Sequence, residues 1–287
     1  MKMIKQYPTL ALLSSVLVLG LLFLAPLLPG TAFAQGLNMK GDAKGLPLTV
    51  DAEEGIEWRQ NEFVFIARGN ARAVRGTMTV SGDELRAYYR EGSKAGSDVW
   101  RLDSIGNVVM TTPGEKATGD NAVYDVERGI LVLKPAPGGV ARLVSGNEEI
   151  SAKGQLEFWE TRQISVARGE ARAVQQGRTL FADVLVAHLT KSAAGESTIK
   201  RIEAYDRVKI VTAEDTVTAS RGTYVPQSGI ATLVGSVRMV RGENTLEGCR
   251  AVVDTKAGVS RLFACPATAG GQKGGRVKGQ LVPKKAK

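Results

Sequence analysis

Side chains able to perform acid–base, nucleophilic or metal chemistry are few and scattered in this sequence. The only histidine, His188, lies between Ala187 and Leu189 at a position expected to face solvent. Because one histidine and two distant cysteines cannot supply the ligands of a zinc site, we expect no metal and no other cofactor. The sequence also lacks a Gly-x-Ser-x-Gly nucleophile elbow and a Gly-x-x-x-x-Gly-Lys-Ser/Thr phosphate-binding loop.

Carboxylates do occur in adjacent pairs, and two acids flanking a sugar bond are the catalytic groups of most glycosidases. Here the pairs fall in predicted turns or at predicted strand starts, where solvated charges are expected. We therefore expect a binding protein and not an enzyme. The pairs are Glu53/Glu54, Asp83/Glu84, Glu148/Glu149 and Glu214/Asp215.

The two cysteines, Cys249 and Cys265, lie close to the C-terminal end of the repeated part of the chain. In an exported protein they can form one disulfide. The alternative is a pair of free thiols at a frayed end, and the sequence favours neither reading.

The net charge of +9 is concentrated at the two ends of the chain. Residues 1–34 contribute +2 and residues 266–287 contribute +6, which leaves the body close to neutral. A folded part without a basic face is not expected to bind nucleic acid. The segment 266–287 is rich in glycine and lysine and is expected to be a disordered basic tail.

The first residues have the order of a secretory signal. Lys2 and Lys5 precede an apolar run over residues 10–28, and Ala32-Phe-Ala34 supplies small residues for cleavage. We expect a signal peptide over 1–34 and a linker over 35–45. Because the apolar run is long enough to span a bilayer, an uncleaved membrane anchor is the alternative.

One hexapeptide recurs along the body and organises the rest of the chain. Gly69-Asn-Ala-Arg-Ala-Val74 returns as Gly169-Glu-Ala-Arg-Ala-Val174, one hundred residues later. A period of about 20–50 residues indicates a stacked, repeating architecture. Weaker copies begin at Gly106, Gly139, Asp206 and Gly235.

In every copy the third and fifth residues are apolar, and in five of the six copies the residue between them is basic. This alternation is typical of a strand with one dry face and one wet face. The predicted fold is therefore all-β, with about 16 short antiparallel strands over residues 46–265, built from repeats of about 30–37 residues, each with about three short strands.

The dry faces of successive repeats form one apolar strip. The strip is either an ordinary sandwich core or a groove that also holds a ligand, and the pattern alone leaves both open. Small residues such as Ala71, Ala171 and Gly222 suggest spare room inside. The predicted lipid-binding residues are Leu85, Tyr89, Val108, Met110, Tyr124, Val126, Leu143, Leu156, Phe158, Leu185, Leu189, Val208, Ile210, Tyr224, Val237 and Met239.

The repeats resemble the OstA/LptA-like family, the periplasmic bridge proteins of lipopolysaccharide transport. The motifs that carry the resemblance are Gly119-Asp-Asn-Ala-Val-Tyr124, Ala219-Ser-Arg-Gly-Thr-Tyr224 and the Ala-Arg-Gly-x-Ala-Arg-Ala segments that begin at Ala67 and Ala167. The likeness covers roughly residues 46–264. It implies a twisted β-jellyroll in the periplasm whose apolar interior shields the acyl chains of lipopolysaccharide.

The resemblance also implies the partners: lipopolysaccharide, a head-to-tail homo-oligomer, an inner-membrane transport complex driven by ATP and an outer-membrane translocon. Stacking needs free sheet edges. We expect these edges near residues 58–66 and 245–263.

The sequence leaves three alternative functions open. The chain could be the inner-membrane-anchored jellyroll component of the same pathway. It could be a polysaccharide-processing enzyme on a β-solenoid, which should show acids and a basic catalytic residue clustered on one strand face. It could also be a structural filament of the envelope that binds no lipid.

Overall fold

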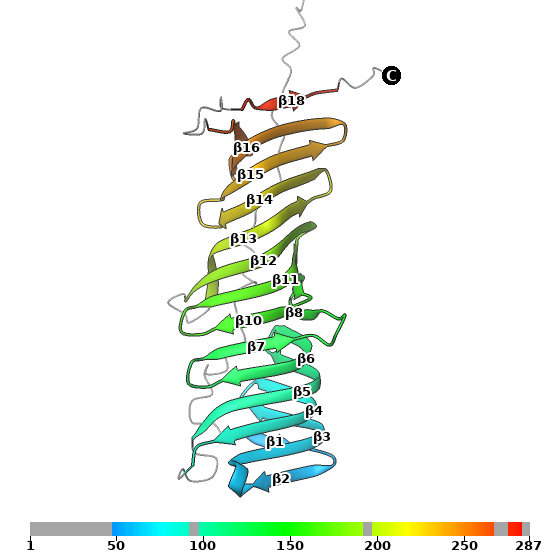
Figure 1. Ribbon diagram of the computed structural model, residues 1–287, viewed down its shortest axis with the longest axis vertical. Helices are drawn as coiled ribbons and strands as arrows, with labels where there is room; N and C mark the ends of the chain where they lie inside the picture. Colours follow the sequence, from blue (N-terminus) through cyan, green and yellow to red (C-terminus); the bar gives the residue numbers. More distant parts are fainter. Residues whose placement is uncertain (1–47, 92–97, 192–196, 267–274, 283–287) are drawn as a thin grey trace, which may run out of the picture.

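The computed structural model describes residues 48–91, 98–191, 197–266 and 275–282. This part of the chain forms 18 strands and one short 3-10 turn, Gln60–Glu62, and every strand pairing in it is antiparallel. The strands stack into an elongated molecule with β2 at one end and β18 at the other (Figure 1). The all-β fold predicted from the sequence is confirmed. The predicted signal peptide and linker lie outside the described residues.

The strands are β1 (Thr49–Asp51), β2 (Gly55–Arg59), β3 (Val64–Arg75), β4 (Met78–Tyr89), β5 (Val99–Thr112), β6 (Glu115–Asp125), β7 (Ile130–Lys134), β8 (Ala141–Ser145), β9 (Glu148–Ala152), β10 (Gln155–Trp159), β11 (Ile164–Gln175), β12 (Arg178–Lys191), β13 (Ser197–Val211), β14 (Asp215–Val225), β15 (Ile230–Arg241), β16 (Asn244–Asp254), β17 (Val259–Phe263) and β18 (Lys278–Gln280). Within the described ranges, no helix is long and apolar enough to cross a membrane.

The first two residues of the recurring hexapeptide form a bend within a strand. Gly69 and Asn70 both have positive φ angles, and the register of β3 against β4 shifts between Arg68 and Ala71. A left-handed backbone is easy for glycine and is tolerated by asparagine, which explains the residue types. The same paired positive φ angles occur at residues 106–107, 169–170, 206–207 and 235–236.

Each of the five strands that contain such a bulge is folded over, so that its two halves belong to two facing layers. These strands are β3, β5, β11, β13 and β15. Leu102 lies before the bulge of β5 and Met110 lies after it, yet both belong to one apolar cluster. The sequence predicted about three separate short strands in each repeat. That detail was wrong, because β11 and β15 run through the bulge without a break.

The chain contains a duplication with an offset of one hundred residues. Strands β2, β3 and β6 have equivalents in β10, β11 and β14 at that offset. We call residues 49–145 the first module and residues 148–254 the second module. They are joined edge to edge, because β10 pairs with β7 and β9 pairs with β8. The copy of the hexapeptide that begins at Gly139 lies at this joint, where a loop replaces the bulge.

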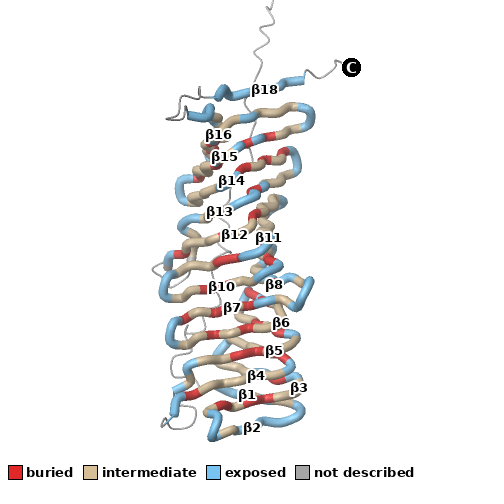
Figure 2. Tube along the Cα trace, in the orientation of Figure 1, coloured by how far each residue is buried: buried red, intermediate tan, exposed pale blue. Residues whose placement is uncertain are grey.

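The third residue of the hexapeptide is buried in all six copies, which confirms the predicted dry face. Buried segments lie along the strands, and exposed segments lie at the turns (Figure 2). The interior consists of two apolar clusters, one centred on Val108 and Met110 and one on Val208 and Val237. The six buried third residues are Ala71, Val108, Ala141, Ala171, Val208 and Val237.

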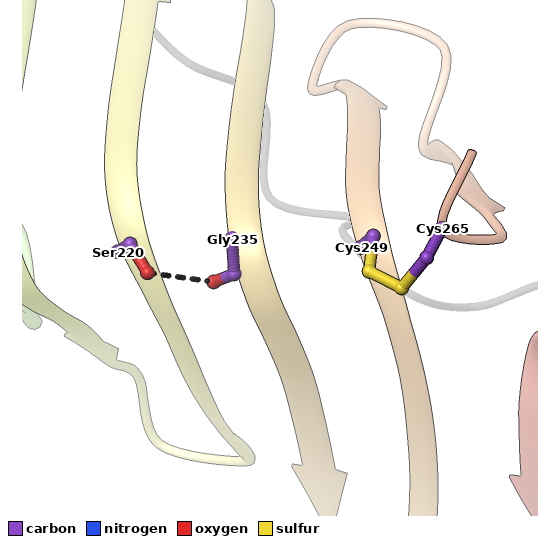
Figure 3. Close-up of a disulfide and its surroundings, with 4 residues drawn as sticks. All are labelled: Ser220, Gly235, Cys249 and Cys265. Carbon is purple, nitrogen blue, oxygen red and sulfur yellow. Dashed lines mark hydrogen bonds between the residues drawn. A yellow bond between two sulfur atoms is a disulfide. The ribbon is translucent and has the colours of Figure 1, made fainter. Parts of the chain in front are cut away.

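At the C-terminal end, Cys249 of β16 and Cys265 form a disulfide with a Cα–Cα distance of 4.8 Å (Figure 3). Beyond it, β18 pairs antiparallel with the first half of β16. The Val282 backbone N–H also donates a hydrogen bond of 2.8 Å to Asn244 Oδ1. This part of the predicted disordered tail is therefore ordered on the sheet.

The free sheet edges lie farther out than the sequence suggested. Strand β3 has partners on both sides, so the N-terminal edge is formed by β1 and β2. Strand β16 is likewise covered by β17 and β18, which form the C-terminal edge. The expected edges included β3 and β16 because the pairing of short flanking strands cannot be read from the alternation of residues.

Candidate functional site

The first module encloses an apolar groove of about 410 Å³ between its two layers. Its wall includes Val80, Leu85, Ala87, Leu102, Met110 and Tyr124, together with residues of β1, β2 and β3. In Figure 1 these strands form the end of the molecule drawn in blue and cyan. Ligand pockets commonly have volumes of about 300–1,000 Å³, so the groove is large enough for a small apolar ligand.

Three of the sixteen predicted lipid-binding residues, Leu85, Met110 and Tyr124, line this groove. The others lie on the inner faces of the two modules, where they are buried or half-buried among apolar side chains. None of the sixteen is exposed. The thirteen outside the groove are Tyr89, Val108, Val126, Leu143, Leu156, Phe158, Leu185, Leu189, Val208, Ile210, Tyr224, Val237 and Met239.

Small residues were expected to leave space in the apolar interior, but the interior is tightly packed around them. Ala71 and Ala171 are completely buried beside the bulges. A Cβ atom built on Gly222 would lie 3.1 Å from the Leu233 side chain, which is tight packing. Small side chains at these positions therefore allow the two layers to approach each other near the bend.

The two modules differ in how their interiors are filled. Leu85 lines the groove and is half-buried, whereas Leu185, its equivalent one hundred residues later, is 3% exposed within the second cluster. The second cluster also contains Leu233, Val237 and Met239. The second module is thus packed around Leu185, while the first module is open around Leu85.

An aromatic group stands beside the groove at its outer end. The Trp58 ring stacks on Phe65 with centroids 5.3 Å apart, and Trp58 Nε1 donates a hydrogen bond of 2.7 Å to Tyr89 Oη. Phe65 lines the groove, and Trp58 is 47% exposed on edge strand β2. These rings extend the apolar wall toward the N-terminal edge.

Three acids are buried on the inner face. Glu148 and Asp215 were expected to be solvated, and Glu115 was not singled out from the sequence. Glu115, Glu148 and Asp215 are each 6% exposed. Asp215 forms an ion pair of 2.7 Å with Arg241, and Glu148 accepts a hydrogen bond from Gln175. Burial raises the pKa of Glu148, and it raises the pKa of Glu115 to about 7 against an opposing hydrogen bond from Thr112. Solvation was therefore the wrong prediction for Glu148 and Asp215.

The lone histidine has a structural partner. His188 Nε2 lies 2.9 Å from Glu203 Oε2, and Arg201 contacts the same carboxylate group. Among the residues that the structure describes, no group of three or more histidine, cysteine or acidic side chains could hold a metal ion. His188 is therefore part of a charged cluster on the outer face.

The lipid-binding residues predicted from the sequence do not include Arg75 or most of the groove wall contributed by the N-terminal strands. Residues 71, 73 and 75 share one face of the strand, so the alternation places Arg75 on the dry face. Its position could therefore have been predicted from the sequence. Leu48, Val50 and Ile56 were not proposed because β1 and β2 are too short to display a clear alternation.

Fold and groove together define an all-β tandem-repeat protein with an apolar ligand-sized cavity. The chain belongs to the LptA/(LptD N-terminal domain) LPS transport protein family, whose model matches residues 49–155 and 149–259. The two matched ranges correspond closely to the two modules. The resemblance to OstA/LptA-like proteins inferred from the hexapeptides is confirmed.

Individual relatives are distant. An uncharacterized protein of Rhizobium meliloti (strain 1021) is 25% identical over 104 residues, which are 35% of this chain and 54% of that protein. The chain thus spans about half the length of this curated relative. The crystal structure of LptH, the LptA homologous periplasmic component of the lipopolysaccharide transport device from Pseudomonas aeruginosa, aligns with 83% of this chain and 96% of its own at 12% identity and a TM-score of 0.20.

Proposed function

We propose that this protein is a non-enzymatic lipid carrier that shields acyl chains of lipopolysaccharide in the groove of its first module. The observation that carries the proposal is an apolar cavity of about 410 Å³ in a member of a lipopolysaccharide transport family. We assign it to the periplasm as part of a bridge between the inner and outer membranes.

The energetic need for such a groove follows from the acyl chain. Each CH₂ group removed from water contributes about 0.8 kcal/mol, so a chain of about a dozen carbons gains about 10 kcal/mol. An unshielded chain would have to overcome a penalty of this size to cross an aqueous compartment. A protein groove removes most of the penalty without any chemical step.

A bridge also needs contacts at both ends of the molecule. Ile56 on β2 is 55% exposed at the N-terminal edge, and Val259 and Phe263 on β17 are 44% and 42% exposed at the C-terminal edge. An unpaired edge with exposed apolar side chains suits addition of another strand. We infer head-to-tail contacts with further copies, with an inner-membrane transport complex and with an outer-membrane translocon.

The duplication supplies a matched experiment for the carrier function. A photo-crosslinking amino acid is placed at position 85 in the groove or at position 185 in the packed second module, in living cells. We expect adducts with lipopolysaccharide from position 85 and few or none from position 185. Position 172, on the outer face of β11, serves as a second control.

Crosslinks at position 85 would support the carrier function. Equal labelling at positions 85 and 185 would contradict the assignment of the site to the first module. Labelling from position 172 alone would contradict the assignment of the inner face as the lipid-binding face.

A further inference from the structure

The groove wall contains two arginines, Arg75 and Arg86, and within the described ranges only Arg86 has an ion-pair partner. Arg75 is the last residue of β3 and lines the groove. Its Nε atom is buried and lacks a hydrogen-bond partner within the described part of the chain. A buried donor without an acceptor is unfavourable, so its retention calls for an explanation.

The other polar side chains of the groove wall have partners of their own. Arg86 forms an ion pair with Glu84, and Asp103 forms one of 2.7 Å with Arg101. Tyr124 Oη donates a hydrogen bond of 3.0 Å to Glu160, and burial together with Glu160 raises the pKa of this phenol while the charge of Arg75 opposes the rise. Arg75 lines the same groove as Tyr124, and among the described residues no acceptor satisfies its Nε–H group.

The second module shows how the same position looks when it is satisfied internally. The residue one hundred positions after Arg75 is Gln175, which donates a hydrogen bond to the buried Glu148. The equivalent of Glu148 in the first module is Leu48, an apolar residue in the groove wall. In the packed second module Gln175 is satisfied by Glu148, whereas in the first module Arg75 Nε has no partner in the part of the chain that the structure describes.

We propose that Arg75 binds the anionic group of an amphiphile whose acyl chain occupies the groove, so that the site recognises a phosphate or carboxylate attached to a hydrocarbon chain. The inference rests on the proposed carrier function and adds the chemical class of the ligand. A guanidinium group holds such an anion through two parallel hydrogen bonds, which an ammonium group does not reproduce. The apolar wall supplies affinity, and Arg75 fixes the direction in which the chain enters.

The test measures binding of three probes to the complete chain by isothermal titration calorimetry. The two amphiphilic probes are kept below the concentrations at which they aggregate. Dodecyl phosphate carries both features, dodecanol carries only the chain, and inorganic phosphate carries only the anion. Arg75→Gln copies the residue of the second module. Arg72→Gln changes an exposed arginine on the outer face of the same strand and is the matched control.

We expect wild-type protein and the Arg72→Gln variant to bind dodecyl phosphate about 10- to 100-fold more tightly than dodecanol, since hydrogen bonds to charged groups have free energies of that order. Arg75→Gln should bring the two affinities to within about twofold and leave dodecanol binding unchanged. Inorganic phosphate alone should bind at least about 100-fold more weakly than dodecyl phosphate, because it lacks the chain.

Two outcomes would overturn the inference, and they can be told apart. If both amphiphiles bind equally to wild type and to Arg75→Gln, the groove holds chains without reading their charge, and only the role of Arg75 fails. If neither amphiphile binds to any of the proteins, the carrier function fails with it. Circular dichroism of each variant verifies that the fold is retained.

Discussion

Glu115 offers a direct test of the difference between the two modules. It faces Ser145 on the neighbouring strand β8, whereas the equivalent acid of the second module, Asp215, faces Arg241 on β15. Asp215 is therefore neutralised by an ion pair, whereas the buried Glu115 accepts a hydrogen bond from Thr112 and forms no ion pair with the described residues. Replacing Glu115 with glutamine removes a charge that the folded protein accommodates poorly.

The magnitude follows from the pKa of Glu115. Burial raises it from an ordinary value of 4.5 to about 7, so between these pH values the folded protein binds more protons than the unfolded chain. The unfolding free energy therefore falls as pH rises through this window. At about 1.4 kcal/mol for each pKa unit, the full effect above pH 8 is about 3 kcal/mol.

The assay is urea denaturation at a series of pH values from 4 to 8, with the disulfide kept oxidised. We expect Glu115→Gln to match the wild type near pH 4 and to exceed its unfolding free energy by up to about 3 kcal/mol at pH 8. Asp215→Asn is the matched control and should have the opposite sign, because it removes the buried carboxylate of the ion pair with Arg241 and leaves the exposed Glu214 as a weaker counter-charge. Removing one partner of a buried pair costs about 3–5 kcal/mol, and the partial exposure of Arg241 reduces this to about 1–3 kcal/mol.

The reasoning would be refuted if Glu115→Gln were less stable than the wild type at pH 8, or if its effect did not change with pH. A destabilising effect would mean that Glu115 is stabilised as a carboxylate in the folded protein, and an effect independent of pH would mean that folding does not raise its pKa. A stabilising effect of Asp215→Asn would separately contradict the ion-pair assignment.

Gly119→Ala should lower the unfolding free energy by about 1–3 kcal/mol in urea denaturation. The new Cβ would lie 2.6 Å from Leu133 Cδ1 and 2.8 Å from the Lys134 carbonyl oxygen. Gly222→Ala, where the nearest atom is 3.1 Å away, should have a smaller effect. Reducing the disulfide should lower stability by up to about 3 kcal/mol and speed hydrogen exchange of the β18 amides, and unchanged exchange would show that the pairing with β16 holds without the bond. Ile56→Lys on edge strand β2 should reduce self-association in light scattering, and an unchanged mass at high concentration would argue against this edge as a contact surface.

Much of the fold could be predicted from the sequence because alternation is a local property. The burial of Val108, Met110 and Val237 follows from a count of every second residue. The same count failed at the first residue of five of the six hexapeptides, where the pattern looked like the start of a strand but the strand continues through a bulge. The positive φ angles of Gly69 and Asn70 show that the strand continues through a bend, and a backbone angle of this kind leaves only a weak trace in the residue types.

The groove itself was harder to predict than the face on which it lies. Leu85 and Leu185 occupy equivalent places one hundred residues apart, yet one lines a cavity and the other is packed. The difference comes from which side chains approach from other strands, and those neighbours are set by pairing and by the fold of the two layers. A single strand carries no information about the volume left between two sheets.

The sequence by itself determined the all-β class, the return of the hexapeptide after one hundred residues and the parity of the dry face, since each is read from the order of residue types along the chain. The tertiary structure alone decided that the first module holds the open groove, that Glu148 and Asp215 are buried, and that Arg75 lines the groove with its Nε–H unsatisfied by any described residue. These features depend on distances between residues far apart in the chain, and such distances exist only once the strands have paired and the two layers have closed on each other.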